Sequence, residues 1–206
     1  MCCCICIFFS NICPCLVLTL TDLTSSPLNI RHRHIIGGNH DYCGDIHQQL
    51  ALAQDETNRW VFPDLNYKLT KKFTDEKTGR SGTVDILMID TMHLAGFACG
   101  AVEDELSMEF FAQPPGPLSL VEASTTLSWV ESELAKSNAD YLLVAGHYPI
   151  FSPCSHGNTD ELVKTLDPLL KKYGVTAYIS GHEHCQFHYS FDNMEYFLTG
   201  TGNGCC

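Results

Sequence analysis

The sequence predicts an α/β fold with layered sheets, and two observations lead to that prediction. Short apolar runs that end in Gly, Asp or His recur along the chain, as buried strands do. Two longer segments carry apolar residues at three- and four-residue steps, which is the period of one helix face. The length of 206 residues indicates one domain with a sizeable core rather than two domains.

The predicted strands begin after residue 30. They are "VDILMID" (84–90), "YLLVAGH" (141–147), "VTAYISGH" (175–182) and "EYFLTG" (195–200). A helix is predicted over 119–137, with its buried face formed by Leu120, Ala123, Leu127, Val130 and Leu134.

A second helix is predicted over 159–173, with one apolar side formed by Leu162, Leu166, Leu169 and Tyr173. Asn158 and Glu161 resemble a capping box at its start. Pro168 predicts a kink, and Gly174 suits the position after the last turn.

The composition separates a leader from the domain. Residues 1–29 form a cysteine-rich apolar leader and a polar linker, and residues 30–206 form the predicted domain. The apolar run at 2–20 has the length of a signal peptide but lacks positive residues before it. A signal, a membrane anchor, a partly buried segment and a sequence that did not evolve as the start of this domain all remain open. Six of the twelve cysteines lie in this leader, and the scattered remainder allow one disulfide in an oxidising compartment.

The formal charge of −12 argues against a nucleic-acid partner, because phosphate backbones are bound by clustered basic residues. A small phosphate ester held by a local cation is compatible with that charge.

Three strand-end phrases, "GGNHDY", "GHYP" and "GHEH", place polar side chains directly after a glycine. Sites in α/β folds form at the carboxyl ends of strands, so we expect these side chains at one sheet edge. The side chains are Asn39 and His40, then His147, then His182 and His184, with Glu183 pointing away if the backbone is extended. Imidazole nitrogens and an amide oxygen suit zinc, manganese or iron. His40 would face the site without binding metal, oriented by Asp41, and protonate a leaving alkoxide.

With these motifs the chain resembles the metallophosphoesterases, and within them the purple acid phosphatases, over about residues 35–204. "GNHD", "GHYP" and "GHEH" occur in that family's order, and "LSWVESELAKSNADYLLVAGHYPIFS" is similar as well. The resemblance implies metallophosphoesterase-like sheets flanked by helices, here incomplete at the N- and C-terminal strands. It also implies hydrolysis of phosphomonoesters, from small esters or a phosphoprotein, by iron with a second iron or zinc.

The resemblance assigns roles to individual residues. Asn39, His147 and His182 match ligands of the second metal, and His184 matches the histidine ligand of the ferric ion. His40, and His156 in "SPCSHG", match histidines that contact the substrate phosphate. The family's members are secreted or lysosomal, which is the expected location.

The sequence departs from the family before residue 35. The family's D-x-G and GD-x-x-Y motifs, which supply aspartates and a tyrosine to the metals, are absent, and Asp22 is the single acidic residue there. We therefore expect at most one well-held metal and weak or no phosphatase activity. The alternatives are a non-catalytic protein that binds one divalent metal, and a product that residues 2–20 attach to a membrane.

Overall fold

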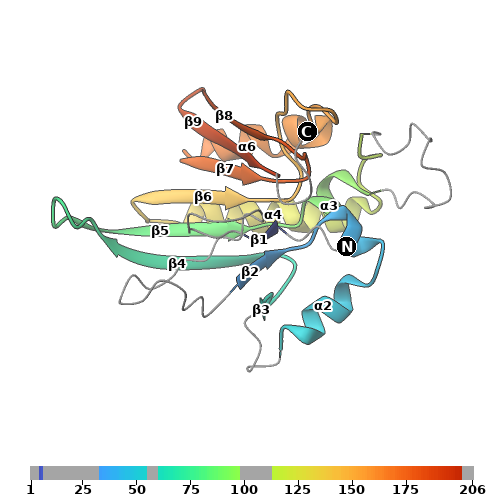
Figure 1. The fold of residues 1–206 in the computed structure, drawn as a ribbon, viewed down its shortest axis with the longest axis horizontal. Coiled ribbons are helices and arrows are strands. Elements are labelled where there is room, and N and C mark those ends of the chain that lie inside the picture. Colours follow the sequence, from blue (N-terminus) through green and yellow to red (C-terminus); the bar gives the residue numbers. More distant parts are fainter. Residues whose placement is uncertain (1–4, 7–32, 55–59, 98–112, 201–206) are drawn as a thin grey trace.

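The computed structural model describes residues 5–6, 33–54, 60–97 and 113–200 (Figure 1). Its centre is a six-stranded sheet in the order β4-β5-β6-β7-β9-β8. The strands are β4 (Tyr67–Thr74), β5 (Ser81–Met88), β6 (Tyr141–Ala145), β7 (Ala177–Ser180), β8 (Gln186–Phe191) and β9 (Met194–Thr199). The pairs β5–β6, β6–β7 and β7–β9 are parallel, and the outer strands β4 and β8 pair antiparallel. The predicted strands over 84–90, 141–147, 175–182 and 195–200 are therefore confirmed.

A smaller sheet in the order β1-β2-β3 lies on one side of the large sheet. Its strands are β1 (Ile5–Cys6), β2 (Arg33–Ile36) and β3 (Trp60–Val61). Ile35 and Ile36 of β2 are fully buried in a core with Ile86 and Met88 of β5. The hydroxyl of Tyr67 in β4 donates to the carbonyl of Ile35 at 2.8 Å, which joins the two layers.

Helices cover the other face of the large sheet (Figure 1). These helices are α3 (Thr91–Ala95), α4 (Leu120–Lys136), α5 (Asp160–Thr165) and α6 (Asp167–Lys172). Leu87 of β5 and Val144 of β6 pack in this second core against Val130 of α4 and Leu162 of α5. Because alternate residues at the C-terminal end of β5 enter different cores, both faces of the strand are buried there, and the residues "ILM" are continuously apolar. Two further helices among the described residues, α1 (Asn39–Tyr42) and α2 (Ile46–Leu52), follow β2, and Ile46 of α2 packs in the core of the small sheet.

The structure also corrects details of the predicted helices. Ala123, Val130 and Leu134 of α4 are buried as predicted, but Leu120 is 77% exposed because it lies in the first turn, beyond the packed face. The segment 159–173 is two helices with a break at Leu166, directly before Asp167 and Pro168. Gly174 has a positive φ of 64°, as expected after a last turn.

The capping box predicted from Asn158 and Glu161 is wrong. Thr159 is the N-cap of α5 and makes no side-chain capping hydrogen bond. The Asn158 side chain instead accepts a hydrogen bond from the Ser152 amide at 2.9 Å, so it stabilises the preceding loop.

The leader predicted over residues 1–29 lies almost entirely outside the described residues. Within the described part of the chain, no helix is both long and apolar enough to cross a membrane.

Candidate metal centre

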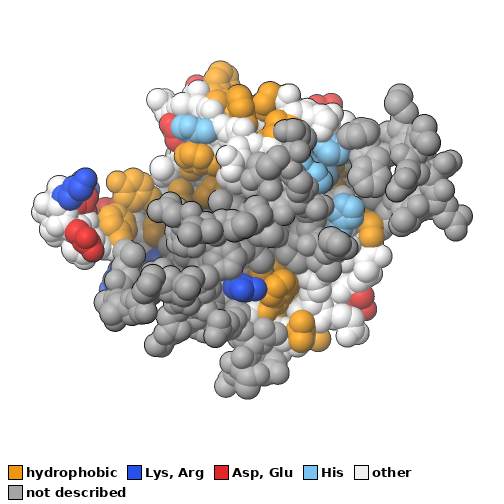
Figure 2. All heavy atoms as spheres, in the orientation of Figure 1, with side chains coloured by type: hydrophobic (Ala, Val, Ile, Leu, Met, Phe, Trp, Pro, Cys, Tyr) orange, Lys and Arg blue, Asp and Glu red, His pale blue; other side chains and the backbone are white. Residues whose placement is uncertain are grey.

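The predicted site residues gather where β2, β6 and β7 end. Figure 2 shows histidine side chains on the side of the molecule to which the β6 arrow points in Figure 1. The ring of His147 is 5.2 Å from that of His182, and the ring of His182 is 4.5 Å from that of His156, between centroids. The charges of His40 and His184 are close enough to lower the pKa of His147. The expectation that these histidines share one site is consistent with this arrangement.

Asn39 reaches the site from the small sheet. It begins α1 directly after β2, and the buried Asp41 holds this turn by accepting from the Gly38 amide at 2.8 Å. The second carboxylate oxygen of Asp41 accepts from the Gln49 side chain at 2.7 Å. The Asn39 amide oxygen then lies 2.9 Å from Nε2 of His147.

Two glycines are needed for this approach. A Cβ on Gly38 would lie 2.7 Å from Cε1 of His147, so only glycine lets the imidazole pack against the backbone. A Cβ on Gly146 would lie 2.5 Å from the Tyr178 hydroxyl. The glycines of "GGNH" and "AGHY" therefore provide space for neighbouring side chains.

His182 has a left-handed backbone, with φ of 67°. The prediction that residues 182–184 are extended, with Glu183 pointing away from the site, is therefore wrong. The Glu183 side chain is fully buried and lies 2.9 Å from Nδ1 of His156. Burial raises the pKa of Glu183, but hydrogen bonds from His156 and Ser152 outweigh that effect and lower it below its usual value.

The buried imidazoles of the site are neutral over a wide pH range. Burial, with a smaller contribution from His40, lowers the pKa of His147 to about 3. Burial, followed by the charge of His147, lowers the pKa of His182 to about 2. Neutral imidazoles keep a lone pair for a metal ion at acidic pH, where an ordinary histidine is protonated.

The donor set fits one divalent ion. The Asn39 amide oxygen and Nε2 of His147 lie 2.9 Å apart, so two atoms that can bind a divalent metal face each other across the layers. Nδ1 of His147 is buried and has no hydrogen-bond partner among the described residues, so no hydrogen bond from them fixes which nitrogen of the ring carries the proton. His182 would add a third nitrogen donor.

The described residues contain few acidic side chains in metal-binding arrangements. Within them, no group of three or more His, Cys, Asp or Glu side chains is arranged to hold a metal ion. Asp90, at the end of β5, is buried, and burial raises its pKa. Its carboxylate accepts from the Met92 amide and contacts the Tyr42 hydroxyl, so it caps α3 and fixes α1.

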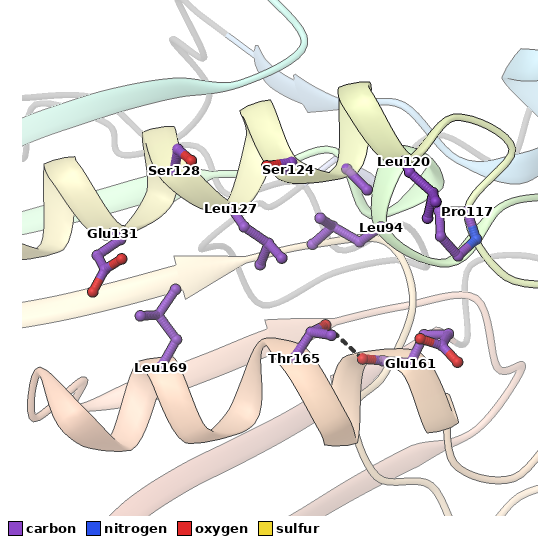
Figure 3. Close-up of a pocket in the computed structure, with 11 residues that line it drawn as sticks. Leu94, Pro117, Leu120, Ser124, Leu127, Ser128, Glu131, Glu161, Thr165 and Leu169 are labelled. Atoms are coloured by element: carbon purple, nitrogen blue, oxygen red, sulfur yellow. Dashed lines mark hydrogen bonds between the residues drawn. The ribbon is translucent and has the colours of Figure 1, made fainter.

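A separate hollow of about 460 Å³ lies between α4 and the α5–α6 pair (Figure 3). Leu94, Leu127 and Leu169 line it, with Glu131 and Glu161 as its charged residues. Its lining contains no histidine. The clustered imidazoles, rather than this hollow, carry the chemistry expected of the chain.

Two features of the site were not found by sequence reasoning: the role of Glu183, and the particular disulfide, Cys154–Cys185. The disulfide joins the loop that carries His156 to the segment that follows His184. The available signals were an acidic residue between two histidines and a cysteine close to each motif.

Sheets, helices and strand-end histidines of this kind define a metal-dependent phosphoesterase fold. The chain belongs to the calcineurin-like phosphoesterases, whose family pattern matches residues 15–186. It is similar to tartrate-resistant acid phosphatase type 5 from Homo sapiens, with 41% identity over 82% of this chain and 49% of the relative. The Oryctolagus cuniculus relative is 43% identical over the same shares of the two chains. Purple acid phosphatase 4 of Arabidopsis thaliana is 28% identical over 92% of this chain and 52% of its own.

Among solved structures, GAP50, described as the anchor in the inner membrane complex of Plasmodium, aligns with a TM-score of 0.63. It is 26% identical, over 81% of this chain and 48% of that one. The chain spans about half the length of the curated relatives it matches. The predicted resemblance and fold class are confirmed.

Proposed function

We propose that this chain is a phosphomonoesterase domain of the acid phosphatase type that holds one divalent ion and turns over weakly. The observation that supports the proposal is the approach of Asn39 and His147 to 2.9 Å, beside the ring of His182. The relatives that the chain resembles are acid phosphatases by name, which supports the same reaction class for this chain.

Each site residue has a role in this proposal. Asn39, His147 and His182 would hold the divalent ion, which in the family is iron or zinc. His184 matches the family's histidine ligand of the ferric ion, which this proposal leaves unbound. A bound ion of this kind polarises a phosphoryl oxygen and lowers the pKa of bound water.

His40 and His156 would contact the substrate phosphate. His40 is exposed and follows the ligand Asn39, so it would hydrogen-bond the phosphate and pass a proton to the leaving alkoxide. His156 packs against His182 and would contact the phosphate from the opposite loop.

The same residues limit the expected activity. Ferric ions favour carboxylate and phenolate oxygen, and within the described residues no group of three or more His, Cys, Asp or Glu side chains is placed to hold a metal ion. Without a bridging carboxylate, two ions cannot clamp the attacking and leaving oxygens. The substrate would be a small phosphate ester or a phosphoprotein, and the formal charge of −12 disfavours nucleic acid.

The location expected from the resemblance, secreted or lysosomal, is part of this proposal. The Cys154–Cys185 disulfide supports it, because disulfides persist in oxidising compartments.

The test is metal analysis paired with hydrolysis of p-nitrophenyl phosphate, with iron and zinc added. We expect about one metal per chain, weak turnover, and no visible charge-transfer absorption from a tyrosine on iron. The His182→Asn variant should lose metal, whereas His188→Asn is the matched control because His188 is exposed on β8 and pairs with Glu195. Robust turnover with two metals would refute the single-ion proposal.

A second candidate is a non-catalytic domain that binds one divalent ion. It is favoured by the same pair, Asn39 and His147, beside the ring of His182, because binding one ion needs no second metal site. One metal per chain with no turnover above a His182→Asn background would establish this candidate instead.

A further inference from the structure

Glu183 makes four contacts with a single loop. The loop comprises residues 152–156 between β6 and α5. Oε1 of Glu183 accepts from the Ser152 hydroxyl at 3.0 Å and from the His156 amide at 2.9 Å. Oε2 lies 3.4 Å from the Ser155 hydroxyl and 2.9 Å from Nδ1 of His156. Both carboxylate oxygens are therefore used to hold the segment that carries His156.

This carboxylate is fully buried, and a buried carboxylate is costly unless hydrogen bonds and charge satisfy it. Its backbone is fixed as well, since a Cβ on Gly200 would lie 1.5 Å from the Glu183 carbonyl oxygen. The left-handed His182 turns the chain so that Glu183 points toward the His156 loop. A group held this firmly can determine the orientation of a neighbouring ring.

We infer that Glu183 is a positioning residue that fixes the imidazole of His156 with its proton on Nδ1 and presents Nε2 to the phosphate. A carboxylate only accepts hydrogen bonds, so Nδ1 must be the donor in this contact. Any proton that His156 exchanges with a substrate then moves at Nε2. This inference rests on the proposed function, in which His156 contacts the phosphate.

The inference predicts a definite tautomer. Because hydrogen bonds to charged groups are stronger than those to neutral groups, we expect a preference of at least about 10 to 1 for the Nδ1–H form. The Glu183→Gln variant keeps the size and the buried polar group. Its carbonyl can still accept from Ser152 and the His156 amide, while its NH₂ group donates to Nδ1 and moves the ring proton to Nε2.

The experiment is ¹⁵N NMR of histidine-labelled full chain, metal-free, at a pH where imidazole is neutral. We expect a single Nδ1–H form for His156 in the unchanged protein and an Nε2–H form in Glu183→Gln. The control is Glu195→Gln, the same substitution at the exposed His188–Glu195 pair, which should leave the His156 signals unchanged. Averaged tautomers in the unchanged protein, or an Nδ1–H form that persists in folded Glu183→Gln, would overturn the inference.

The unchanged protein alone decides the first half of the test, so the inference stays testable if Glu183→Gln fails to fold. Titration of the zinc-loaded protein with inorganic phosphate tests the proposed function separately. A shift of the Nε2 signal of His156 on adding phosphate supports the proposed function, and the absence of a shift refutes the phosphate contact. The tautomer measured without phosphate tests the role of Glu183 in either case.

Discussion

The Cys154–Cys185 disulfide should contribute measurably to the stability of the domain. The two cysteines are 31 residues apart in sequence, and the closed loop contains α5, α6 and β7. The chain-entropy relation for a loop of this length gives roughly 3.7 kcal/mol at 25 °C. Replacing both cysteines with serine, which avoids a mispaired thiol, should lower the free energy of unfolding by about that amount.

Urea unfolding, followed by tryptophan fluorescence, measures the difference. Under oxidising conditions we expect the Cys154→Ser/Cys185→Ser variant to be less stable by roughly 3.7 kcal/mol. With reductant present, the bridge is absent from both proteins, so the gap should shrink to less than about 1 kcal/mol. Equal stabilities under oxidising conditions, or a gap that reductant does not change, would refute the reasoning.

The remaining predictions concern the site and the core. Gly38→Ala should displace His147, whose ring lies 2.7 Å from the added Cβ, cost about 1–3 kcal/mol, and weaken zinc binding measured by calorimetry. Gly44→Ala is its control, since its Cβ would lie 3.5 Å from the nearest atom, and equal zinc affinities in the two variants would contradict the prediction. Because the pKa values of His147 and His182 in the folded chain are about 3 and about 2, metal-free protein should lose stability as pH falls below about 6.5, where only the unfolded chain takes up these protons. His182→Asn, which suits the left-handed backbone, should make urea unfolding less pH-dependent, and an unchanged slope would exclude His182 as a source. Leu162→Ala, at a fully buried position, should cost about 2–5 kcal/mol, against less than about 0.5 kcal/mol for Leu120→Ala at a 77% exposed position, and similar thermal midpoints for the two would argue against the described core.

The strands and the longest helix were predictable because burial on both faces leaves a strong pattern. The C-terminal end of β5 alternates between two cores, so its last residues, "ILM", are all apolar, and this apolar run predicted a buried strand of an α/β fold. The outer strands were not predicted. β4, "YKLTKKFT", and β8, "QFHYSF", are partly exposed edges, so polar residues interrupt their alternation.

The gathering of Asn39, His147 and His182 was predictable because glycine marked each strand end. The role of Glu183 was not, because it depends on the backbone of one residue. The alternation rule assumes an extended chain, and the φ of 67° at His182 reverses its conclusion for the next side chain. Pairing of Cys154 with Cys185 depends on two loops that meet only after folding.

Asn39 and His147 belong to different layers of the molecule. Asn39 follows β2 in the small sheet, and His147 follows β6 in the large one. Aliphatic packing between such layers has little directional preference, so it opposes separation better than sliding. A cation bound by both side chains would link the two layers at this end of the molecule. Its loss would first allow the two sheets to slide relative to each other.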